Sequence, residues 1–281
     1  MVSRINVRMI TMSQGQVELS LPERFELAAA DMFWVPPEVE VIERPEITYT
    51  RSANPNPLYN AVARSRAGSL AEVRRLVSEV LAAHGGASRW RVFSHVEAPG
   101  LVDALTEAGY AKTHEHKLMV FPVERELGGR EADPRWRVAR IETVEQLLDC
   151  REVTERAFER PMPHASRERL EEELAGCADP DGRVARFVVY DRASGEAASA
   201  GGLTLDPRFG LGFLWAGGTV PEFQGQGAYS MLIRARLDHA RAAGLSHVGL
   251  YARLDTSAPV VARRGFTCEG RMDWWERPAQ S

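Results

Sequence analysis

The sequence predicts an α/β (α+β) protein of two similar domains, each with a mixed, mostly antiparallel sheet flanked by helices. Three observations favour this fold class. Apolar segments with strand-like and helix-like spacing alternate along the chain. At 281 residues the chain is long for one domain and comfortable for two. The two halves also resemble each other in the order of these segments, which is typical of a duplicated domain.

Composition excludes several classes of protein. The hydrophobic fraction of 44% and the charged fraction of 26% are ordinary for a globular protein. A net charge of −4 without a long basic run gives no reason to expect nucleic-acid binding. No apolar run approaches the roughly 20 residues that a membrane helix needs, and the first residues do not resemble a signal peptide. Cys150, Cys177 and Cys268 lack metal-type spacing, so we expect free thiols in a reducing cytoplasm and no metal site.

In the N-terminal half, helical spacing of apolar residues alternates with short apolar strands. Ser69 is a good N-cap for the second helix, and Gly109 follows the third. The segment 52–57 contains two prolines and two asparagines and is predicted to be a loop. We expect helices at 21–32, 69–83 and 100–108, and strands at 39–42, 47–50, 90–94 and 116–123.

A polar segment at 124–135 contains Gly128, Gly129 and Pro134 and is predicted to link the two domains, 1–130 and 131–281. The second half then repeats the alternation of strands and helices. We expect helices at 144–158, 166–175, 228–243 and 257–264, a hairpin of strands at 187–190 and 199–205, and further strands at 136–141, 247–251 and from Phe266 onward.

The two halves match at an offset of 156 residues. This offset places 90–93 on 246–249 and 105–110 on 261–266, where each half has a short helix ending in glycine and an aromatic residue. It also places 68–71, with Ser69 and Leu70, opposite 224–227. Because these side chains would crowd a pyrophosphate, we expect only the second half to bind one. The alternative is that many α/β chains show such similarity by chance.

Residues 214–229 carry the most specific signal in the chain. They have the pattern of an apolar strand, a glycine-rich turn and the start of an amphipathic helix. Such a turn leaves several backbone N–H groups unpaired and pointing one way, and the helix dipole adds partial positive charge there. Gly225 and Gly227 allow the backbone to approach an anion closely. The segment therefore predicts a site for a phosphate or pyrophosphate.

At these residues the C-terminal half resembles the GNAT superfamily of acyl-CoA-dependent N-acyltransferases. The family pattern Gln/Arg-x-x-Gly-x-Gly/Ala falls on Gln224-Gly225-Gln226-Gly227-Ala228-Tyr229, with Tyr229 where glycine or alanine is usual. The run 257–266 resembles the short family helix that ends in Gly-Phe. The resemblance covers roughly 136–276, and the N-terminal half resembles a degenerate copy. Nucleoside-triphosphate and Rossmann fingerprints are both missing from the sequence.

The resemblance implies that acetyl-CoA is the cofactor and that an amine attacks its thioester directly. The backbone N–H groups of the segment from Gln224 to Tyr229 would hold the pyrophosphate, and a bulge at Gly217-Gly218 would expose a strand edge to the pantetheine amides. We expect the Val220 N–H to be the oxyanion donor. The predicted cofactor-binding residues are Thr219, Val220, Gln224, Gly225, Gln226, Gly227, Ala228, Tyr229 and Ser257.

Proton transfer is the step that the sequence assigns least well. Many members of the family place a tyrosine four residues before the glycine of the short helix, and this position is Val261 here. The remaining candidates are Glu222 as a base acting through water, Tyr251 as a phenol, and Ser257 as a relay. Each also has a plain structural explanation. Glu222 would be a solvated turn carboxylate, Tyr251 a partly buried ring, and Ser257 a helix N-cap.

Other functions stay open at this stage. Without a tyrosine at 261, the protein would also suit a non-catalytic acyl-CoA sensor or structural subunit, or an aminoacyl transferase of related tandem architecture. An acidic acceptor pocket would indicate a polyamine or cationic drug, and an arginine-lined pocket an amino acid. The sequence gives no oligomeric state. A bulky acidic residue in place of Gly227 is expected to abolish coenzyme binding while leaving the fold intact.

Overall fold

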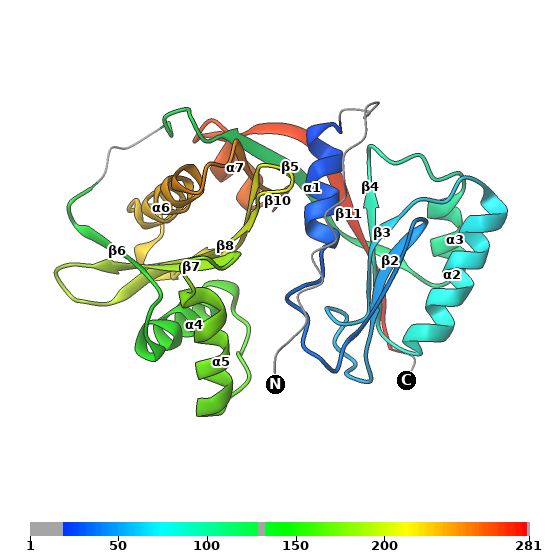
Figure 1. The fold of residues 1–281 in the computed structure, drawn as a ribbon, viewed down its shortest axis with the longest axis horizontal. Helices are drawn as coiled ribbons and strands as arrows, with labels where there is room; N and C mark the ends of the chain where they lie inside the picture. The colour runs from blue at the N-terminus through cyan, green and yellow to red at the C-terminus, as the bar shows by residue number, and fades with distance from the viewer. Residues whose placement is uncertain (1–18, 129–132, 280–281) are drawn as a thin grey trace.

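One continuous sheet of eleven strands runs through the computed structural model, which describes residues 19–128 and 133–279. Its strand order is β1-β2-β3-β4-β11-β5-β10-β9-β8-β7-β6, and helices pack on both of its faces (Figure 1). Within the described residues, β3–β4 and β9–β10 are parallel and the other neighbouring pairs are antiparallel. The predicted fold class is therefore confirmed.

In Figure 1 the first helix of the N-terminal half lies between this half and the other one. The rest of the N-terminal half forms strands with helices packed against them. Its second helix starts where predicted, because the Ser69 hydroxyl accepts a hydrogen bond from the Glu72 N–H, and it ends at Gly85 with φ +63°. The prediction missed β3, a short run of mostly buried residues. The elements are α1 (Leu21–Ala30), β1 (Glu40–Arg44), β2 (Ile47–Arg51), β3 (Ala61–Ser65), α2 (Leu70–His84), β4 (Ser88–Phe93), α3 (Leu101–Glu107) and β5 (Ala111–Pro122).

The C-terminal half follows the predicted order of elements. Thr143 and Gln146 form a capping box at the start of α4, which spans the predicted residues. The predicted linker is neither helix nor strand where it is described, and its residues 129–132 lie outside the described part of the chain. The elements are β6 (Trp136–Arg140), α4 (Val144–Phe158), α5 (Arg167–Ala178), β7 (Val184–Asp191), β8 (Ala197–Asp206), β9 (Leu211–Thr219), the 3-10 turn η1 (Pro221–Phe223), α6 (Ala228–Ala242), β10 (His247–Arg253), α7 (Ser257–Ala262) and β11 (Thr267–Arg277).

The two halves exchange their last strands. β5 of the first half pairs with β10 of the second, β11 of the second half pairs with β4 of the first, and β5 and β11 pair with each other. This exchange joins the halves into one sheet across the predicted boundary, and the division at 130/131 stays a prediction. Because each half contributes a strand to the other, either half alone would leave a strand edge of its sheet uncovered.

The register of β5 and β11 reveals a local two-fold relation. His116 pairs with Met272, its counterpart at the offset of 156, and the pairs on either side, Trp274 with His114 and Gly270 with Leu118, map onto each other. The two bulges obey the same relation. The extra residue is Glu269 on β11 in one bulge and Thr113 on β5 in the other, and these positions also differ by 156. The offset deduced from sequence thus describes these two strands well.

The predicted register of the preceding strand is wrong by four residues. Trp90 pairs with Trp275, and Leu250 pairs with Met119, which is the counterpart of Trp275. Trp90 therefore corresponds to Leu250, not to Ser246. The cause is the connection from β4 to α3, residues 94–100, which is four residues longer than the connection from β10 to α7, residues 254–256.

The parallel pair β9–β10 opens toward its C-terminal end. The strands pair only from Leu211 with His247 to Phe213 with Gly249, although β9 continues to Thr219 and β10 to Arg253. Backbone groups on the edge of β9 that faces away from β8 therefore pair with no other strand of the described residues over its second half. The opening lies beside the turn that leads into α6, which positions the candidate site.

Helix α1 connects the halves, and it contacts β3, β9 and β11. Its Phe25 is fully buried against Leu118 and Leu211. Its Glu26 is also fully buried, and the carboxylate accepts hydrogen bonds from both terminal nitrogens of Arg66 and lies 2.6 Å from His95 Nε2. None of the described helices has the length and apolar character needed to cross a membrane.

Candidate functional site

The turn between β9 and α6 presents a set of unpaired backbone N–H groups. Gly225 and Gly227 have φ of +73° and +104°, in the left-handed region that favours glycine. The N–H groups of Gly225, Gly227, Ala228 and Tyr229 have no acceptor among the described residues. Those of Gln224 and Gln226 donate to Pro221 and Phe223 within the turn. Four of the six predicted amides are thus free to hold an anion at the helix N-terminus.

A cation that the sequence analysis missed lies beside this turn. Arg135 Nη1 donates to Gln226 Oε1 at 2.6 Å, and its guanidinium also pairs with Asp191 at 2.6 Å. The Gln226 amide nitrogen donates to the Glu222 carbonyl, so the side chain of Gln226 bridges the turn and Arg135. The arginine precedes β6, 91 residues earlier in the chain, and no local sequence pattern could have placed it there.

The predicted oxyanion donor is wrong. The Val220 N–H donates to the Ala198 carbonyl at 3.0 Å, and Val220 is fully buried, so this amide cannot reach a ligand. By the alternation of a strand, the neighbouring Thr219 turns its backbone groups away from β8. Its carbonyl indeed accepts from the Gln224 side chain at 3.2 Å. The Thr219 N–H is therefore the amide at the strand end that faces the opening between β9 and β10.

A bulge deforms β9 beside the opening, one residue earlier than the predicted Gly217-Gly218. The register shifts between Ala200 and Gly202, so that Gly201 faces both Ala216 and Gly217. Ala216 has φ +47°, an unusual conformation for a residue with a Cβ atom. Strain of this kind clusters at functional sites, and here it reorients the backbone at the point where β9 leaves β10.

Arg236 lies under this bulge. It is 1% exposed, and its Nη1 donates to the Gly202 carbonyl at 3.3 Å. A Cβ atom at Gly217 would come within 3.2 Å of Arg236 Nη2 and of the Tyr229 ring, which explains the glycine there. Within the described residues it donates to backbone carbonyls and no carboxylate pairs with it, and burial lowers its pKa. Tyr229, the departure from the family pattern, therefore turns inward and packs beside this cation.

The structure gives the three candidates for proton transfer different surroundings. Glu222 is on the exposed turn η1, where Arg156 pairs with it at 2.9 Å; its own backbone N–H and Arg156 lower its pKa. Ser257 is the first residue of α7, and the N-cap is Thr256, so the N-cap explanation of Ser257 is wrong. Val261 is fully buried in the core beneath α7.

Tyr251 lies on β10, beyond the point where this strand stops pairing with β9. Extending the β9–β10 register places it across from Trp215 on the same face of the sheet. Its ring contacts those of Phe213 and Phe93 at centroid distances of 5.8 and 5.9 Å. The hydroxyl oxygen is buried without a hydrogen-bond partner among the described residues. Burial and the charge of Glu26 raise its pKa, so the phenol stays protonated at neutral pH.

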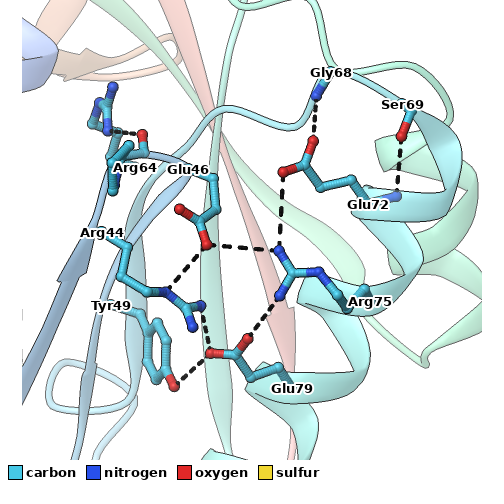
Figure 2. Close-up of polar contacts among 10 residues, drawn as sticks. Arg44, Glu46, Tyr49, Arg64, Gly68, Ser69, Glu72, Arg75 and Glu79 are labelled. Carbon is cyan, nitrogen blue, oxygen red and sulfur yellow. Dashed lines mark hydrogen bonds and ion pairs between the residues drawn. The ribbon is translucent and has the colours of Figure 1, made fainter.

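The equivalent turn of the N-terminal half is closed by its own side chains (Figure 2). The Gly68 N–H donates to Glu72 Oε2 at 2.8 Å, and the Glu72 N–H donates to the Ser69 hydroxyl at 3.2 Å. Arg75 lies 3.9 Å from the Glu72 carboxylate and also approaches Glu46 and Glu79. A carboxylate thus occupies the position that an anion would take at the start of α2.

Gly227 is required by the backbone as well as by a ligand. Its φ of +104° is strained for any other residue, and an added Cβ would lie 3.6 Å from Trp136 Nε1, a buried nitrogen without a partner among the described residues. We expect Gly227→Ala to lower the free energy of unfolding by about 1–3 kcal/mol in urea denaturation. The expectation that an acidic residue at 227 leaves the fold intact is therefore revised.

The control is Gly176→Ala in α5, where no atom lies within 4 Å of the added Cβ and φ is not positive. This change removes a helical glycine and should raise stability by about 0.5–1 kcal/mol. Equal stability of the two variants would contradict the assignment of strain to Gly227.

Within residues 19–128 and 133–279, no group of three or more His, Cys, Asp or Glu side chains could hold a metal ion. Comparison with family models matches residues 147–266 to the acetyltransferase (GNAT) family. Comparison with curated proteins gives no significant match.

Solved structures of similar fold cover most of the chain at low sequence identity. A GCN5-related N-acetyltransferase from Kribbella flavida covers 86% of this chain and 91% of its own, with a TM-score of 0.63 and 14% identity. A tandem GNAT protein from the clavulanic acid biosynthesis pathway covers 91% and 88%, with a TM-score of 0.59 and 12% identity. A GCN5-related N-acetyltransferase from Sphaerobacter thermophilus covers 85% and 76%, with 0.58 and 14%. These similarities establish the tandem fold.

Proposed function

The C-terminal half of this chain is a GNAT acetyltransferase domain, and we propose from this premise that the protein transfers the acetyl group of acetyl-CoA to an amine. The observation that carries the proposal is the set of free N–H groups at Gly225, Gly227, Ala228 and Tyr229, directly after a strand that is bulged and unpaired on one edge. The first half has a self-capped turn in the same place, so the second half is the competent one.

The residues present fit the coenzyme. The four free amides and the dipole of α6 would hold the pyrophosphate, and Arg135, whose charge Asp191 compensates, supports the turn through its hydrogen bond to Gln226. The unpaired edge of β9, including the Thr219 N–H, would pair with amide groups of the pantetheine arm in the manner of an added strand. When bound, acetyl-CoA would supply a thioester carbonyl that an amine can attack.

Tyr251 is the proposed proton donor. It would protonate the CoA thiolate that leaves when the amine nitrogen bonds to the acetyl carbon and the carbon–sulfur bond breaks. Burial raises its pKa, which keeps the proton on the phenol at neutral pH and makes it a weaker acid than an ordinary tyrosine, so it would donate only to the fully formed thiolate. Extending the β9–β10 register two residues past its last pair sets Tyr251 across the opening from Trp215. Glu222 is poorly suited as a base because it is exposed and paired with Arg156, and its pKa is lowered. The acceptor amine, with a pKa of roughly 10, would lose its proton to water before attack.

One observation favours a second function. Val261 is fully buried and apolar, so α7 offers no phenol at the position where the family commonly has one. A non-catalytic protein that binds acyl-CoA would need the same amides but no proton donor. Release of free thiol in the presence of an amine panel would support the enzyme, and tight CoA binding without turnover on any amine would support the sensor.

Gln226→Glu tests the anion site without straining the backbone. The new carboxylate would lie beside Arg135 and near the N-terminus of α6, where negative charge is favourable, but it loses the hydrogen bond that the Gln226 amide donates to the Glu222 carbonyl, so stability should fall by about 1 kcal/mol at most. The same charge repels a bound pyrophosphate and should weaken CoA binding about 10-fold or more, measured by titration calorimetry.

Gln146→Glu is the matched control. Gln146 is the third residue of α4 and takes part in its capping box, so the substitution also adds one negative charge near a helix N-terminus. It should leave CoA affinity unchanged. If Gln226→Glu binds CoA as tightly as the native protein and the control, the amides of this turn do not hold the coenzyme.

A further inference from the structure

A cavity of about 110 Å³ opens on the α4–α5 face of the sheet, on the side of β9 opposite to Arg236. It reaches β9 at Trp215 and the strained Ala216, next to the unpaired edge of that strand. The connection between α4 and α5 contributes Met162 to its wall. The other lining residues are Cys150, Arg151, Thr154, Glu173, Arg186, Gly201 and Gly202.

Two arginines and one glutamate set the charge of the cavity. Glu173 uses both carboxylate oxygens, one for Arg186 Nη1 and the other for Arg151 Nη1 at 3.1 Å. Arg151 Nη2 also donates to the Pro163 carbonyl at 2.7 Å, which leaves that guanidinium engaged on two sides. The lining therefore keeps one uncompensated positive charge, and Glu173 has no free oxygen for a cationic ligand.

Arg186 holds that charge in a form suited to a carboxylate. Its Nε is buried and has no hydrogen-bond partner among the described residues, and within the same residues Nη2 has none either. Nε and Nη2 form one side of the planar guanidinium, the side that matches the two oxygens of a carboxylate. The guanidinium also lies 5.1 Å from the centroid of the Trp215 ring.

The cavity has room for a carboxylate and the carbon that bears it, with a volume of about 110 Å³. Because it is open to solvent, the rest of a ligand can extend outward. The charge of the lining, and not its size, therefore selects the group that enters. An amine next to that carbon would point out of the cavity toward the bulge at Ala216.

We propose that the acceptor is an amino acid, held by its carboxylate on Nε and Nη2 of Arg186 so that its amine faces the opening between β9 and β10. This inference rests on the proposed function for the identity of the reaction, but the binding of the carboxylate is independent of turnover. Arg186 is then a residue that determines specificity, because removing the carboxylate from the ligand leaves a buried guanidinium edge unpaired.

The test compares each of a panel of L-amino acids with the amine formed by its decarboxylation. Saturation-transfer NMR on the full-length protein, with and without CoA, measures binding, and kcat/KM measures turnover. The best amino acid should bind about 10- to 100-fold more tightly than its decarboxylated amine, the range expected for a charge-assisted pair of hydrogen bonds.

Arg186→Lys keeps a positive charge for Glu173 but removes the Nε–Nη2 edge. It should erase most of the difference between the amino acid and its amine, with little effect on the amine alone. The control Arg137→Lys makes the same change on β6, where the guanidinium stacks on Tyr190 at 4.2 Å outside the cavity, and should preserve the difference. The comparison within the native protein stands even if the Arg186 variant fails to fold.

The outcomes separate this inference from the proposed function. If decarboxylated amines bind and are acetylated as well as their parent amino acids, the carboxylate site is wrong and acetyl transfer stands. If amino acids bind through Arg186 but acetyl-CoA does not bind, the site stands and acetyl transfer is wrong. If no amino acid in the panel binds, the inference is overturned.

Discussion

Replacing Glu26 with glutamine is expected to lower the free energy of unfolding by about 3–5 kcal/mol, the range for breaking a buried ion pair from one side. Glu26 is fully buried on α1, where Arg66 donates hydrogen bonds to both of its carboxylate oxygens and His95 contacts one of them. Arg64 lies 3.8 Å away. Glutamine has the same size but leaves these cations without a counter-charge between the two halves. Urea denaturation at pH 7 measures the loss.

The control is Glu23→Gln on the same helix. Glu23 is partly exposed and caps the helix by accepting from the Ser20 N–H, so its loss should cost about 1 kcal/mol at most. Adding Arg66→Met to the Glu26 variant removes one of the stranded cations and should recover part of the stability. A Glu26→Gln variant no less stable than the Glu23 control would contradict the role assigned to this buried carboxylate.

Acidification below pH 6.5 is expected to destabilise the protein strongly through two buried histidines. Burial lowers the pKa of His84 and of His116 to about 4, from the ordinary value of 6.5. His84 lies between the Ser88 hydroxyl at 2.6 Å and the Thr50 carbonyl at 2.8 Å, and His116 lies 3.3 Å from the Met272 carbonyl and packs on Trp274.

The direction in which stability changes with pH follows from proton binding. Between pH 6.5 and 4 the unfolded chain binds protons at these positions that the folded chain does not, so stability is complete above pH 6.5 and falls as the pH approaches 4. At pH 4.5 each histidine should cost about 2–3 kcal/mol. Urea denaturation over this pH range measures the slope.

His84→Gln and His116→Gln should each flatten that slope, whatever their effect on stability at pH 7. His164→Gln is the control, because His164 is exposed on the connection between α4 and α5 and should leave the slope unchanged. A native protein whose stability is flat between pH 4.5 and 7 would contradict the burial of both rings as neutral imidazoles.

Local signals predicted the elements because local interactions form them. The Ser69 hydroxyl caps α2, the Thr143–Gln146 capping box starts α4, and the positive φ of Gly225 and Gly227 shapes the turn before α6. Each of these depends on neighbours within a few residues, so a pattern in the sequence is enough to find it. The short strand β3 lacked such a signal and was missed.

Predictions that depended on the direction of a backbone group or on an insertion were less successful. The Val220 N–H was expected to face a ligand, but the register between β8 and β9 turns it toward Ala198. The counterpart of Trp90 was displaced by four residues because the connection after β4 is longer. Neither the pairing register of two strands nor the effect of a longer connection on that register can be obtained from composition or periodicity alone.

Charged residues inside the sheet layers were also missed, although a signal was present. Arg186 interrupts the apolar run of β7, and Arg236 lies on the buried face of α6. A charged residue at a core position predicts a polar partner or a ligand. The sequence does not say which partner, because Glu173, Gly202 and Trp215 reach these arginines from other elements.

The sequence by itself determined the order of helices and strands apart from β3, the duplicated pattern and the glycine turn at 224–229, since each arises from contacts between residues close along the chain. Only the tertiary structure decided that β5 and β11 cross between the halves, that Arg135 lies beside the turn and that Arg186 faces a cavity next to the bulge of β9. These depend on which distant segments pack together, and packing is a property of the whole sheet that no local pattern contains.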